Sequence, residues 1–307
     1  MTLHPQLQAM VAISAGLPPM HTIPVTTIRA GDLARYDFGV APDAVASVED
    51  RLIPGPAGPL RVRIYRPDGE GMRPVTVFFH GGGFLICSIE THDAMCRRLC
   101  RLGRVIVVSV DYRLAPEHKF PAAPDDCLAA TKWVAANAAT FGGDPARLVV
   151  AGDSAGGNLA AVTALRARNE GGPALRAQVL IYPVTDHHSV QRPSYTENGV
   201  GCGLTRETMM WFWDQYVVQP ADGAHPHASP IRAESLAGLP ETYIVTAKYD
   251  LLRDEGEAFA ERLRQDGVKV SLVRYDDMNH GFLNWVGLID RSTEAMDATC
   301  AWLREVA

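Results

Sequence analysis

Short apolar runs recur along the chain and predict buried strands. Most of the runs are continuous rather than alternating, which is typical of strands that are covered on both faces of a sheet. The expected strands span residues 61–66, 75–79, 105–110, 148–151, 179–182, 242–246 and 268–273. Helical patterns lie between them, over residues 91–102, 122–141, 158–168, 255–265 and 292–306. Because strands alternate with helices, we expect an α/β fold with a mostly parallel sheet.

Two stretches depart from this alternation. Residues 1–45 show helical spacing of apolar positions and then a loop-like pattern. Residues 184–235 are rich in proline and glycine, show no clear strand, and contain an aromatic-rich helix pattern at 205–217. An insertion between two strands is a natural cover for a site at the carboxyl edge of a parallel sheet. We therefore expect an N-terminal cap segment (1–45), a catalytic core in two parts (46–183 and 236–307) and a cap insertion (184–235).

The composition narrows the class of protein. With 307 residues, 47% of them hydrophobic, the chain can bury a large core. The net charge of −6 argues against a nucleic-acid partner. No apolar run reaches the roughly 18 residues of a membrane span, and the first residues lack the basic start and apolar stretch of a signal peptide. These features predict a cytoplasmic protein with neither a nucleic-acid nor a membrane partner.

Cysteine and histidine spacing gives no sign of a metal site. The six cysteines form no C-x-x-C pair and are expected to be reduced thiols. Cys96 and Cys100 lie four apart on an expected helix, where they act as small apolar residues. His225 and His227 flank a proline, but no cluster of cysteines or carboxylates lies nearby in the sequence. We expect neither a metal nor an organic cofactor.

One glycine-rich pentapeptide carries the strongest chemical signal. Gly152-Asp153-Ser154-Ala155-Gly156 lies between the strand expected at 148–151 and the helix expected at 158–168. A G-x-S-x-G sequence in this context is typical of a nucleophile elbow, a sharp turn that exposes the serine hydroxyl at the end of a sheet. The small flanking residues allow the strand and the helix to pack closely. Ser154 is therefore the candidate nucleophile.

A second glycine-rich loop supports this interpretation. His80-Gly81-Gly82-Gly83 follows the strand expected at 75–79. Glycine lets bare backbone N–H groups approach a reacting carbonyl closely. Such groups, together with the N–H of the residue after the nucleophile, form an oxyanion hole. We expect the oxyanion donors to be Gly82, Gly83 and Ala155.

A catalytic serine also requires a base and an acid that orients it. In this class of fold the chain order is serine, then Asp or Glu, then histidine. His280 is the histidine that follows the last expected strands, so we expect it to be the base. Asp250 follows the strand expected at 242–246 and is the favoured acid. The alternative acids stay open: they are Asp254 and Glu255, expected to begin the next helix, and Asp276 and Asp277, which shortly precede the histidine.

Four motifs together resemble a known family. They are HGGG at 80–83, GDSAGG at 152–157, DLLRDE at 250–255 and HGF at 280–282. Further matches to the family pattern are DYRLAPE at 111–117, FPAA at 120–123 and WFW at 211–213. Over about residues 45–300 the chain resembles the hormone-sensitive-lipase-like (bacterial family IV) carboxylesterases of the α/β-hydrolase superfamily. The resemblance implies an α/β-hydrolase fold with a mostly parallel eight-stranded sheet, flanking helices and a small helical cap.

The resemblance also suggests roles for individual residues. Asp153 and Glu117 are expected to hold loops near the elbow by hydrogen bonds, and His80 to orient the glycine loop. The expected substrate-binding residues are Phe84, Trp211 and Phe282. Two positions depart from the family pattern: Leu251 replaces a frequent proline and Cys87 a frequent glycine. Neither change removes a group of the triad or of the oxyanion hole.

The predicted function is that of a serine carboxylesterase for short- to medium-chain acyl esters. The expected partner is a small-molecule ester, and a homodimer is compatible with the family resemblance. Three alternatives remain: a related hydrolase of amides, lactones or thioesters, a non-catalytic small-molecule binder, and an interfacial lipase. The intact Ser-His-acid set argues against a binder, and a small aromatic-rich cap argues against a lipase.

Overall fold

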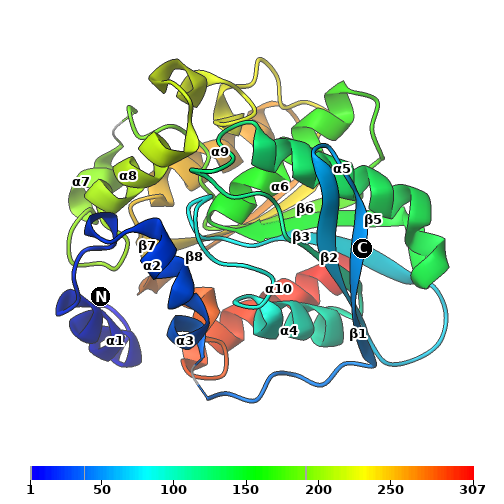
Figure 1. Cartoon of the computed structure of the whole chain (residues 1–307), viewed down its shortest axis with the longest axis horizontal. Coiled ribbons are helices and arrows are strands. Elements are labelled where there is room, and N and C mark those ends of the chain that lie inside the picture. The colour runs from blue at the N-terminus through cyan, green and yellow to red at the C-terminus, as the bar shows by residue number, and fades with distance from the viewer. Residues whose placement is uncertain (1, 38, 191) are drawn as a thin grey trace.

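The computed structural model describes residues 2–37, 39–190 and 192–307 (Figure 1). Within them, eight strands form one sheet in the order β1-β2-β4-β3-β5-β6-β7-β8. β1 pairs antiparallel with β2, and β2 with β4, whereas all further pairs are parallel. The strands are β1 (Ser47–Gly55), β2 (Gly58–Arg66), β3 (Arg73–Phe79), β4 (Ile106–Val110), β5 (Gly143–Asp153), β6 (Ala177–Ile181), β7 (Glu241–Tyr249) and β8 (Val270–Asn279). The expected mostly parallel eight-stranded sheet is confirmed.

Helices cover both faces of this sheet (Figure 1). One face packs against α5 (Ala122–Asn137), α6 (Ala155–Asn169) and α9 (Arg253–Gln265), and the other against α4 (Asp93–Gly103) and α10 (Asp290–Val306). Short 3₁₀ turns follow α5 (η2, Ala138–Phe141) and β8 (η5, Phe282–Trp285). Successive side chains of a strand point to opposite faces, so one strand contributes to both cores.

β3 illustrates this arrangement. Val75, Val77 and Phe79 belong to the core on the α5–α6 side, whereas Phe78 belongs to the core on the α4–α10 side. All four side chains are fully buried. A strand buried on both faces needs apolar residues at every position, which explains the continuous apolar runs in the sequence.

The N-terminal segment and the insertion between β6 and β7 lie together at one end of the sheet (Figure 1). The N-terminal segment contains α1 (Pro5–Ala15), η1 (Met20–Thr22), α2 (Val25–Ala30) and α3 (Asp32–Tyr36). The insertion (residues 184–235) contains α7 (Pro193–Glu197), α8 (Arg206–Tyr216), η3 (Pro220–Ala224) and η4 (Pro230–Arg232). His21 Nδ1 lies 3.2 Å from Thr208 Oγ1, which links the two parts directly.

The structure differs from the sequence-based expectations at two edges of the sheet. β1 was not expected, because its exposed and half-buried positions alternate and it carries charged residues that pair across the hairpin, such as Glu49 with Arg66. β8 was expected to end at residue 273 but continues to Asn279, since an edge strand tolerates the half-buried Asp276 and Asp277. None of the helices in the described residues has the length and apolar character needed to cross a membrane.

Candidate active site

Four residues predicted for the site each come directly after a parallel strand. His80 follows β3, Ser154 follows β5, Asp250 follows β7 and His280 follows β8. Because these strands run in the same direction, their carboxyl ends meet at one edge of the sheet. The sheet therefore brings together residues that are far apart in the sequence.

Ser154 has the strained backbone conformation that the expected nucleophile elbow requires. Its φ and ψ are 55° and −118°, a conformation that few non-glycine residues adopt, and it is only 8% exposed. The turn is tight because β5 and α6 approach closely: a Cβ on Gly156 would overlap the carbonyl oxygen of Phe79. The Ser154 N–H donates to the Ile181 carbonyl of β6 at 2.8 Å, which fixes the turn to the sheet.

Ser154, His280 and Asp250 form a continuous hydrogen-bonded row. His280 Nε2 lies 2.9 Å from Ser154 Oγ, and His280 Nδ1 lies 2.7 Å from Asp250 Oδ2. Asp250 is 1% exposed, and its other oxygen accepts the Leu252 N–H at 2.8 Å. This geometry fits an imidazole that donates from Nδ1 to the carboxylate and accepts the serine hydroxyl proton at Nε2.

The alternative acids have other partners. Asp254 accepts the Ser194 N–H, and Glu255 accepts the Thr185 N–H, both at 2.8 Å. Asp276 pairs with Arg274, and Asp277 pairs with Arg291. Within the described part of the chain, Asp250 is thus the carboxylate in contact with the His280 ring.

The glycine loop after β3 requires its glycines. Gly82 and Gly83 have φ values of 112° and 60°. A Cβ on Gly82 would overlap the Ile86 carbonyl oxygen, and one on Gly83 would overlap the ring of Phe212 in α8. The loop is closed by the Leu85 and Ile86 N–H groups, which both donate to the Gly82 carbonyl at 3.0 Å. Ala155 begins α6, where a helix leaves its N–H groups without helical partners.

Asp153 joins the elbow to the glycine loop, as expected from the sequence. Its Oδ1 accepts the Gly81 N–H at 2.8 Å and lies 3.1 Å from His92 Nε2. Burial alone would raise the pKa of Asp153, but His92, His80 and the Gly81 N–H together outweigh it and hold that pKa below its usual value. Asp153 is therefore a buried carboxylate that stays charged at neutral pH.

His80 has a structural environment that fits its expected orienting role. Its ring stacks on Tyr112 with 4.3 Å between centroids, and its Nδ1 lies 2.7 Å from the Gly81 carbonyl oxygen. The Tyr112 hydroxyl donates to the His80 carbonyl at 2.7 Å. Burial, with a smaller contribution from the neighbouring His92 ring, lowers the pKa of His80 to about 3. The ring is thus neutral at physiological pH.

The loops that carry Asp250 and His280 are held by the insertion. The Ser194 hydroxyl donates to the Leu251 carbonyl at 2.6 Å. Asn198 Nδ2 donates to the carbonyls of Lys248 and Asp250, at 2.9 and 3.0 Å.

A further hydrogen bond is donated by the catalytic-domain core to the insertion. Asn279, which precedes His280, donates from Nδ2 to the Cys202 carbonyl of the insertion at 2.9 Å. Both the acid loop and the histidine loop are thus bonded to the segment between α7 and α8.

The three predicted substrate-binding residues lie in different environments. Phe84 is 1% exposed and stacks on Tyr216 of α8, with 3.8 Å between ring centroids. Phe282 is fully buried, and its ring centroid lies 5.8 Å from that of Tyr182. Trp211 is half-buried on α8. Of the three, Trp211 has the most side-chain surface free for a ligand.

Two other expectations concern surface groups. Glu117 was expected to hold a loop near the elbow, but it forms a two-pronged ion pair with Arg29 of α2. Arg29 also donates to the Leu85 carbonyl of the glycine loop at 2.7 Å, so the side chain that Glu117 pairs with belongs to the N-terminal segment.

His225 and His227 pack edge to face. Among the described residues, no three or more His, Cys, Asp or Glu side chains gather in a metal-binding cluster.

Sequence reasoning missed His92, Ser194 and Asn198. A lone histidine or asparagine outside a motif carries little information by itself, because its role depends on residues distant in sequence. Asn198, for example, bonds to a carbonyl 52 positions further along the chain. The sequence offered one signal for these residues: His92 follows the glycine loop closely, which places it near the candidate site.

Comparisons with known proteins agree with this fold. The sequence profile of the alpha/beta hydrolase fold family matches residues 76–284. The chain is 44% identical over 297 residues to the carboxylic ester hydrolase LipN of Mycobacterium tuberculosis, a match that covers 92% of this chain and 77% of that protein. It is 36% identical to the ethyl acetate hydrolase of Pseudomonas putida, over 96% of each chain.

A solved structure gives the same result in three dimensions. The hyperthermophilic esterase of the archaeon Pyrobaculum calidifontis superimposes with a TM-score of 0.96, at 43% sequence identity and over 100% of both chains. The profile match covers more than half of the chain, and the named relatives are well above 30% identical. This chain therefore belongs to the α/β-hydrolase fold family, among its hormone-sensitive-lipase-like members.

Proposed function

We propose that this protein is a serine carboxylesterase that hydrolyses acyl esters through an acyl-enzyme intermediate. The observation that carries the proposal is the row of two hydrogen bonds from Ser154 through His280 to the buried Asp250. The names of the relatives, which include carboxylic ester hydrolase and ethyl acetate hydrolase, support the ester as substrate.

In the first half of the reaction, Ser154 Oγ attacks the ester carbonyl while His280 Nε2 takes the hydroxyl proton. Asp250 holds the imidazole in the required tautomer and stabilises its charged form. Negative charge develops on the carbonyl oxygen. We assign its stabilisation to the N–H groups of Gly82, Gly83 and Ala155, and the loss of one such donor typically costs about 2.7–4 kcal/mol in the transition state.

The first half ends when His280 donates its proton to the alkoxide oxygen of the leaving alcohol, and the acyl group remains bonded to Ser154 Oγ. In the second half, water replaces the alcohol. His280 then takes a proton from water, the resulting hydroxide attacks the acyl carbonyl, and the acid leaves as Ser154 regains its proton. The oxyanion donors act on both tetrahedral intermediates.

The substrate pocket is proposed to lie between the glycine loop and a cap built from the N-terminal segment and the insertion. Phe212 of α8 contacts Gly83, so the insertion reaches the oxyanion loop itself. Trp211, Phe84 and Phe282 are proposed to shape the pocket. A compact, aromatic cap of this kind favours short- to medium-chain acyl groups over long ones.

The direct test measures hydrolysis of p-nitrophenyl esters from acetate to palmitate. We expect turnover that peaks at short or medium chains and that is lost in Ser154→Ala. Ser292→Ala is the matched control, because Ser292 is a fully buried serine in α10, which packs on the face of the sheet opposite α6. Retained activity in Ser154→Ala would contradict the assignment of the nucleophile. Turnover of matched amides or thioesters but of no ester would instead favour a related hydrolase.

A further inference from the structure

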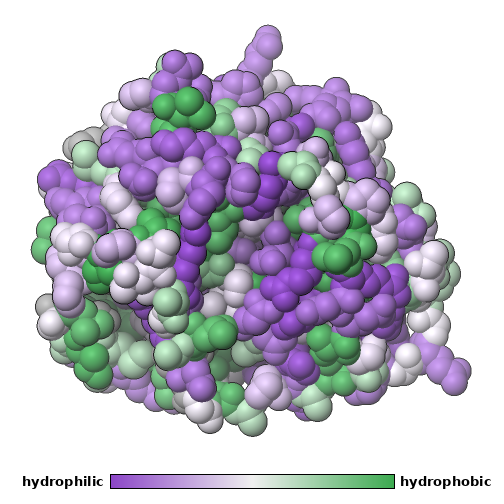
Figure 2. Space-filling view, in the orientation of Figure 1, coloured by the Kyte–Doolittle hydropathy of each residue, from purple (hydrophilic) through white to green (hydrophobic). Residues whose placement is uncertain are grey.

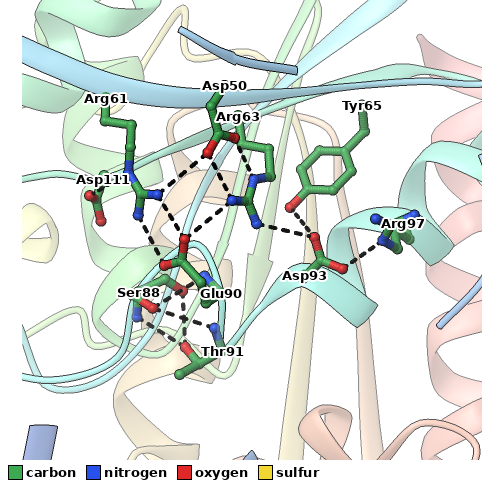
Figure 3. Close-up of polar contacts among 10 residues, drawn as sticks. All are labelled: Asp50, Arg61, Arg63, Tyr65, Ser88, Glu90, Thr91, Asp93, Arg97 and Asp111. Atoms are coloured by element: carbon green, nitrogen blue, oxygen red, sulfur yellow. Dashed lines mark hydrogen bonds and ion pairs between the residues drawn. The ribbon is translucent and has the colours of Figure 1, made fainter. Parts of the chain in front are cut away.

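A short segment after the glycine loop, residues 88–93, connects the molecular surface with the interior of the site. On its outer side, Glu90 receives two hydrogen bonds from Arg61 of β2, at 2.7 and 2.9 Å, and one from Arg63 at 3.2 Å (Figure 3). Asp93 accepts a hydrogen bond from the Tyr65 hydroxyl at 2.9 Å. The surface over the β1–β2 hairpin is mostly hydrophilic, with separate apolar patches (Figure 2). The segment is thus fixed to β2 by charged side chains.

The segment is also closed by its own hydrogen bonds. The Ser88 N–H donates to Thr91 Oγ1 at 3.0 Å, and the Glu90 N–H donates to Ser88 Oγ at 3.2 Å (Figure 3). The hydrogen bonds from Arg61 lower the pKa of Glu90 to about 2, so its carboxylate remains charged over the working pH range. These contacts hold the backbone on both sides of His92 in one conformation.

His92 forms the inner end of this arrangement. Its side chain is 1% exposed, its Nδ1 lies 2.9 Å from Thr91 Oγ1, and its Nε2 lies 3.1 Å from Asp153 Oδ1. The same carboxylate oxygen accepts the Gly81 N–H at 2.8 Å. A buried carboxylate is costly unless it is paired, so the imidazole and the Gly81 N–H together determine where Asp153 lies.

The position of Asp153 matters because it contacts both parts of the candidate site. Asp153 directly precedes Ser154, and Gly81 directly precedes the proposed oxyanion donors Gly82 and Gly83. A displaced carboxylate would release the Gly81 N–H and allow the glycine loop to shift. Displacements of about 1 Å are enough to lower a rate by about a hundredfold when reacting groups must be aligned.

We propose that His92 is a positioning residue for oxyanion stabilisation: its imidazole holds the Asp153 carboxylate against the Gly81 N–H and so keeps the glycine loop in register with Ser154. The inference rests on the proposed esterase function. His92 does not touch the reacting atoms. It acts through Asp153 and Gly81, and the surface network around Glu90 holds it in place.

Three substitutions separate this role from simple packing. His92→Phe keeps the ring volume but removes both nitrogens. His92→Asn places an amide near Thr91 that is too short to reach Asp153, and it serves as a second test where the phenyl ring prevents folding. His92→Gln places its amide donor near the Nε2 position and should preserve the contact with Asp153. The matched control is Tyr65→Phe, which removes a hydrogen bond to Asp93 in the same segment without touching Asp153.

The measurements are kcat and KM for p-nitrophenyl butyrate, together with inhibition by two ketones. A trifluoromethyl ketone forms an oxyanion with the serine, whereas the corresponding methyl ketone serves as a weakly reacting comparison. For His92→Phe and His92→Asn we expect kcat to fall about 10- to 100-fold with KM within about threefold. Affinity for the trifluoromethyl ketone should fall by a similar factor and that for the methyl ketone should not. His92→Gln should stay within about fivefold of the wild type, and Tyr65→Phe should match it.

Two results would overturn the inference while leaving the esterase intact. One is an active wild type with unchanged kcat in both His92→Phe and His92→Asn. The other is an equal loss in Tyr65→Phe or in His92→Gln, since either would show a general structural effect. A wild type that hydrolyses no ester would overturn the proposed function, and the role of His92 with it.

Discussion

Ser154 is held by main-chain contacts with the sheet, whereas the loops of Asp250 and His280 are held by side-chain hydrogen bonds with the insertion. On the serine side, the Ser154 N–H bonds to β6, and the turn closes only because Gly156 brings α6 against β3. These contacts involve backbone atoms of the core. Side chains contribute at the glycine loop, where Asp153 accepts the Gly81 N–H, Tyr112 donates to the His80 carbonyl and Arg29 donates to the Leu85 carbonyl.

On the acid and histidine side, the contacts come from side chains at the surface of the core. Ser194 and Asn198 donate to the loop after β7, and Asn279 donates to the loop between α7 and α8. Changes in the insertion can thus alter the loops of Asp250 and His280. On the Ser154 side, the insertion contributes the close approach of Phe212 to Gly83 and the Val184 N–H, which donates to the Ser154 carbonyl at 3.2 Å. The comparison indicates that Ser154, the proposed nucleophile, is positioned by the core of the fold, whereas the insertion helps to position its proposed partners, His280 and Asp250.

The largest effect is expected from the acid itself. Asp250→Asn should lower kcat by about 10⁴-fold, because the amide no longer selects the productive tautomer of His280. The variant should stay folded, since its carbonyl oxygen can still accept the Leu252 N–H. The ester assay checks this, with Asp276→Asn as control, because Asp276 is half exposed and pairs with Arg274. A greater loss in the control would assign the acid role to Asp276.

The serine side is tested by Gly83→Ala. We expect kcat/KM to fall by about 10²- to 10³-fold, because the added Cβ meets the Phe212 ring and displaces a proposed oxyanion donor. Gly171→Ala is the matched control: its φ of 63° imposes the same backbone strain as the 60° of Gly83, but nothing lies within 4 Å of the new Cβ.

Both glycine variants should lose about 1–2 kcal/mol of stability through their positive φ, measured by denaturant unfolding. Only the Gly83 variant should lose activity. Equal activity in the two proteins would show that the glycine loop does not need its close contact with α8.

The acid side is tested by Asn198→Ala. This change removes two hydrogen bonds to the loop that carries Asp250, and we expect about a tenfold lower kcat with KM nearly unchanged. Asn137→Ala removes a comparable bond, from Asn137 Nδ2 to the Trp133 carbonyl at 2.8 Å, far from the site. It should lose about 1 kcal/mol of stability and no activity. Full activity in Asn198→Ala would mean that the insertion does not position the acid.

The smallest effect concerns pH and stability. Burial raises the pKa of Glu255 to about 8, although the N–H groups of Thr185 and Asp186 oppose that rise. A group whose pKa is higher in the folded state binds more protons there, so its contribution to stability is complete below its unfolded value of 4.5 and is lost as pH rises through about 8.

The melting temperature of the wild type should therefore fall between about pH 5 and about pH 8 more than that of Glu255→Gln, which cannot ionise. Scanning calorimetry across this range checks the difference. Parallel pH curves for the two proteins would contradict the raised pKa. Activity at neutral pH should be similar in both proteins, because Glu255 does not contact His280.

The arrangement of the core was readable because buried strands need apolar residues at every position. The runs at β3, β4 and β5 are of this kind, and all three strands lie in the middle of the sheet. The sequence did not predict β1, because an antiparallel edge strand is half exposed and contains both charged and apolar residues. The local pattern of apolar and polar residues reflects how fully a strand is buried, so it predicts a strand least well where the strand is only partly buried.

The residues of the candidate site also fall into two groups: those that local sequence motifs predict and those that depend on contacts between distant segments. Ser154, Gly82 and Gly83 lie in motifs whose glycines are required by local turns and close approaches, and such requirements are visible within a few residues. The choice of Asp250 among five nearby carboxylates depended on the geometry of β7 and β8. The contacts of His92 and Asn198 join segments that are separated by 61 and 52 positions in the chain.

The sequence by itself therefore determined the α/β class, the elbow, the glycine loop and the candidate base, because each follows from local backbone sterics or from the burial of a strand. Only the tertiary structure decided which carboxylate contacts His280, how the insertion holds the loop of Asp250, and that His92 lies against Asp153 beside the glycine loop. These relations depend on side-chain hydrogen bonds and ion-pair contacts between distant segments. Such bonds are short-ranged and directional, so they exist only after the chain has folded.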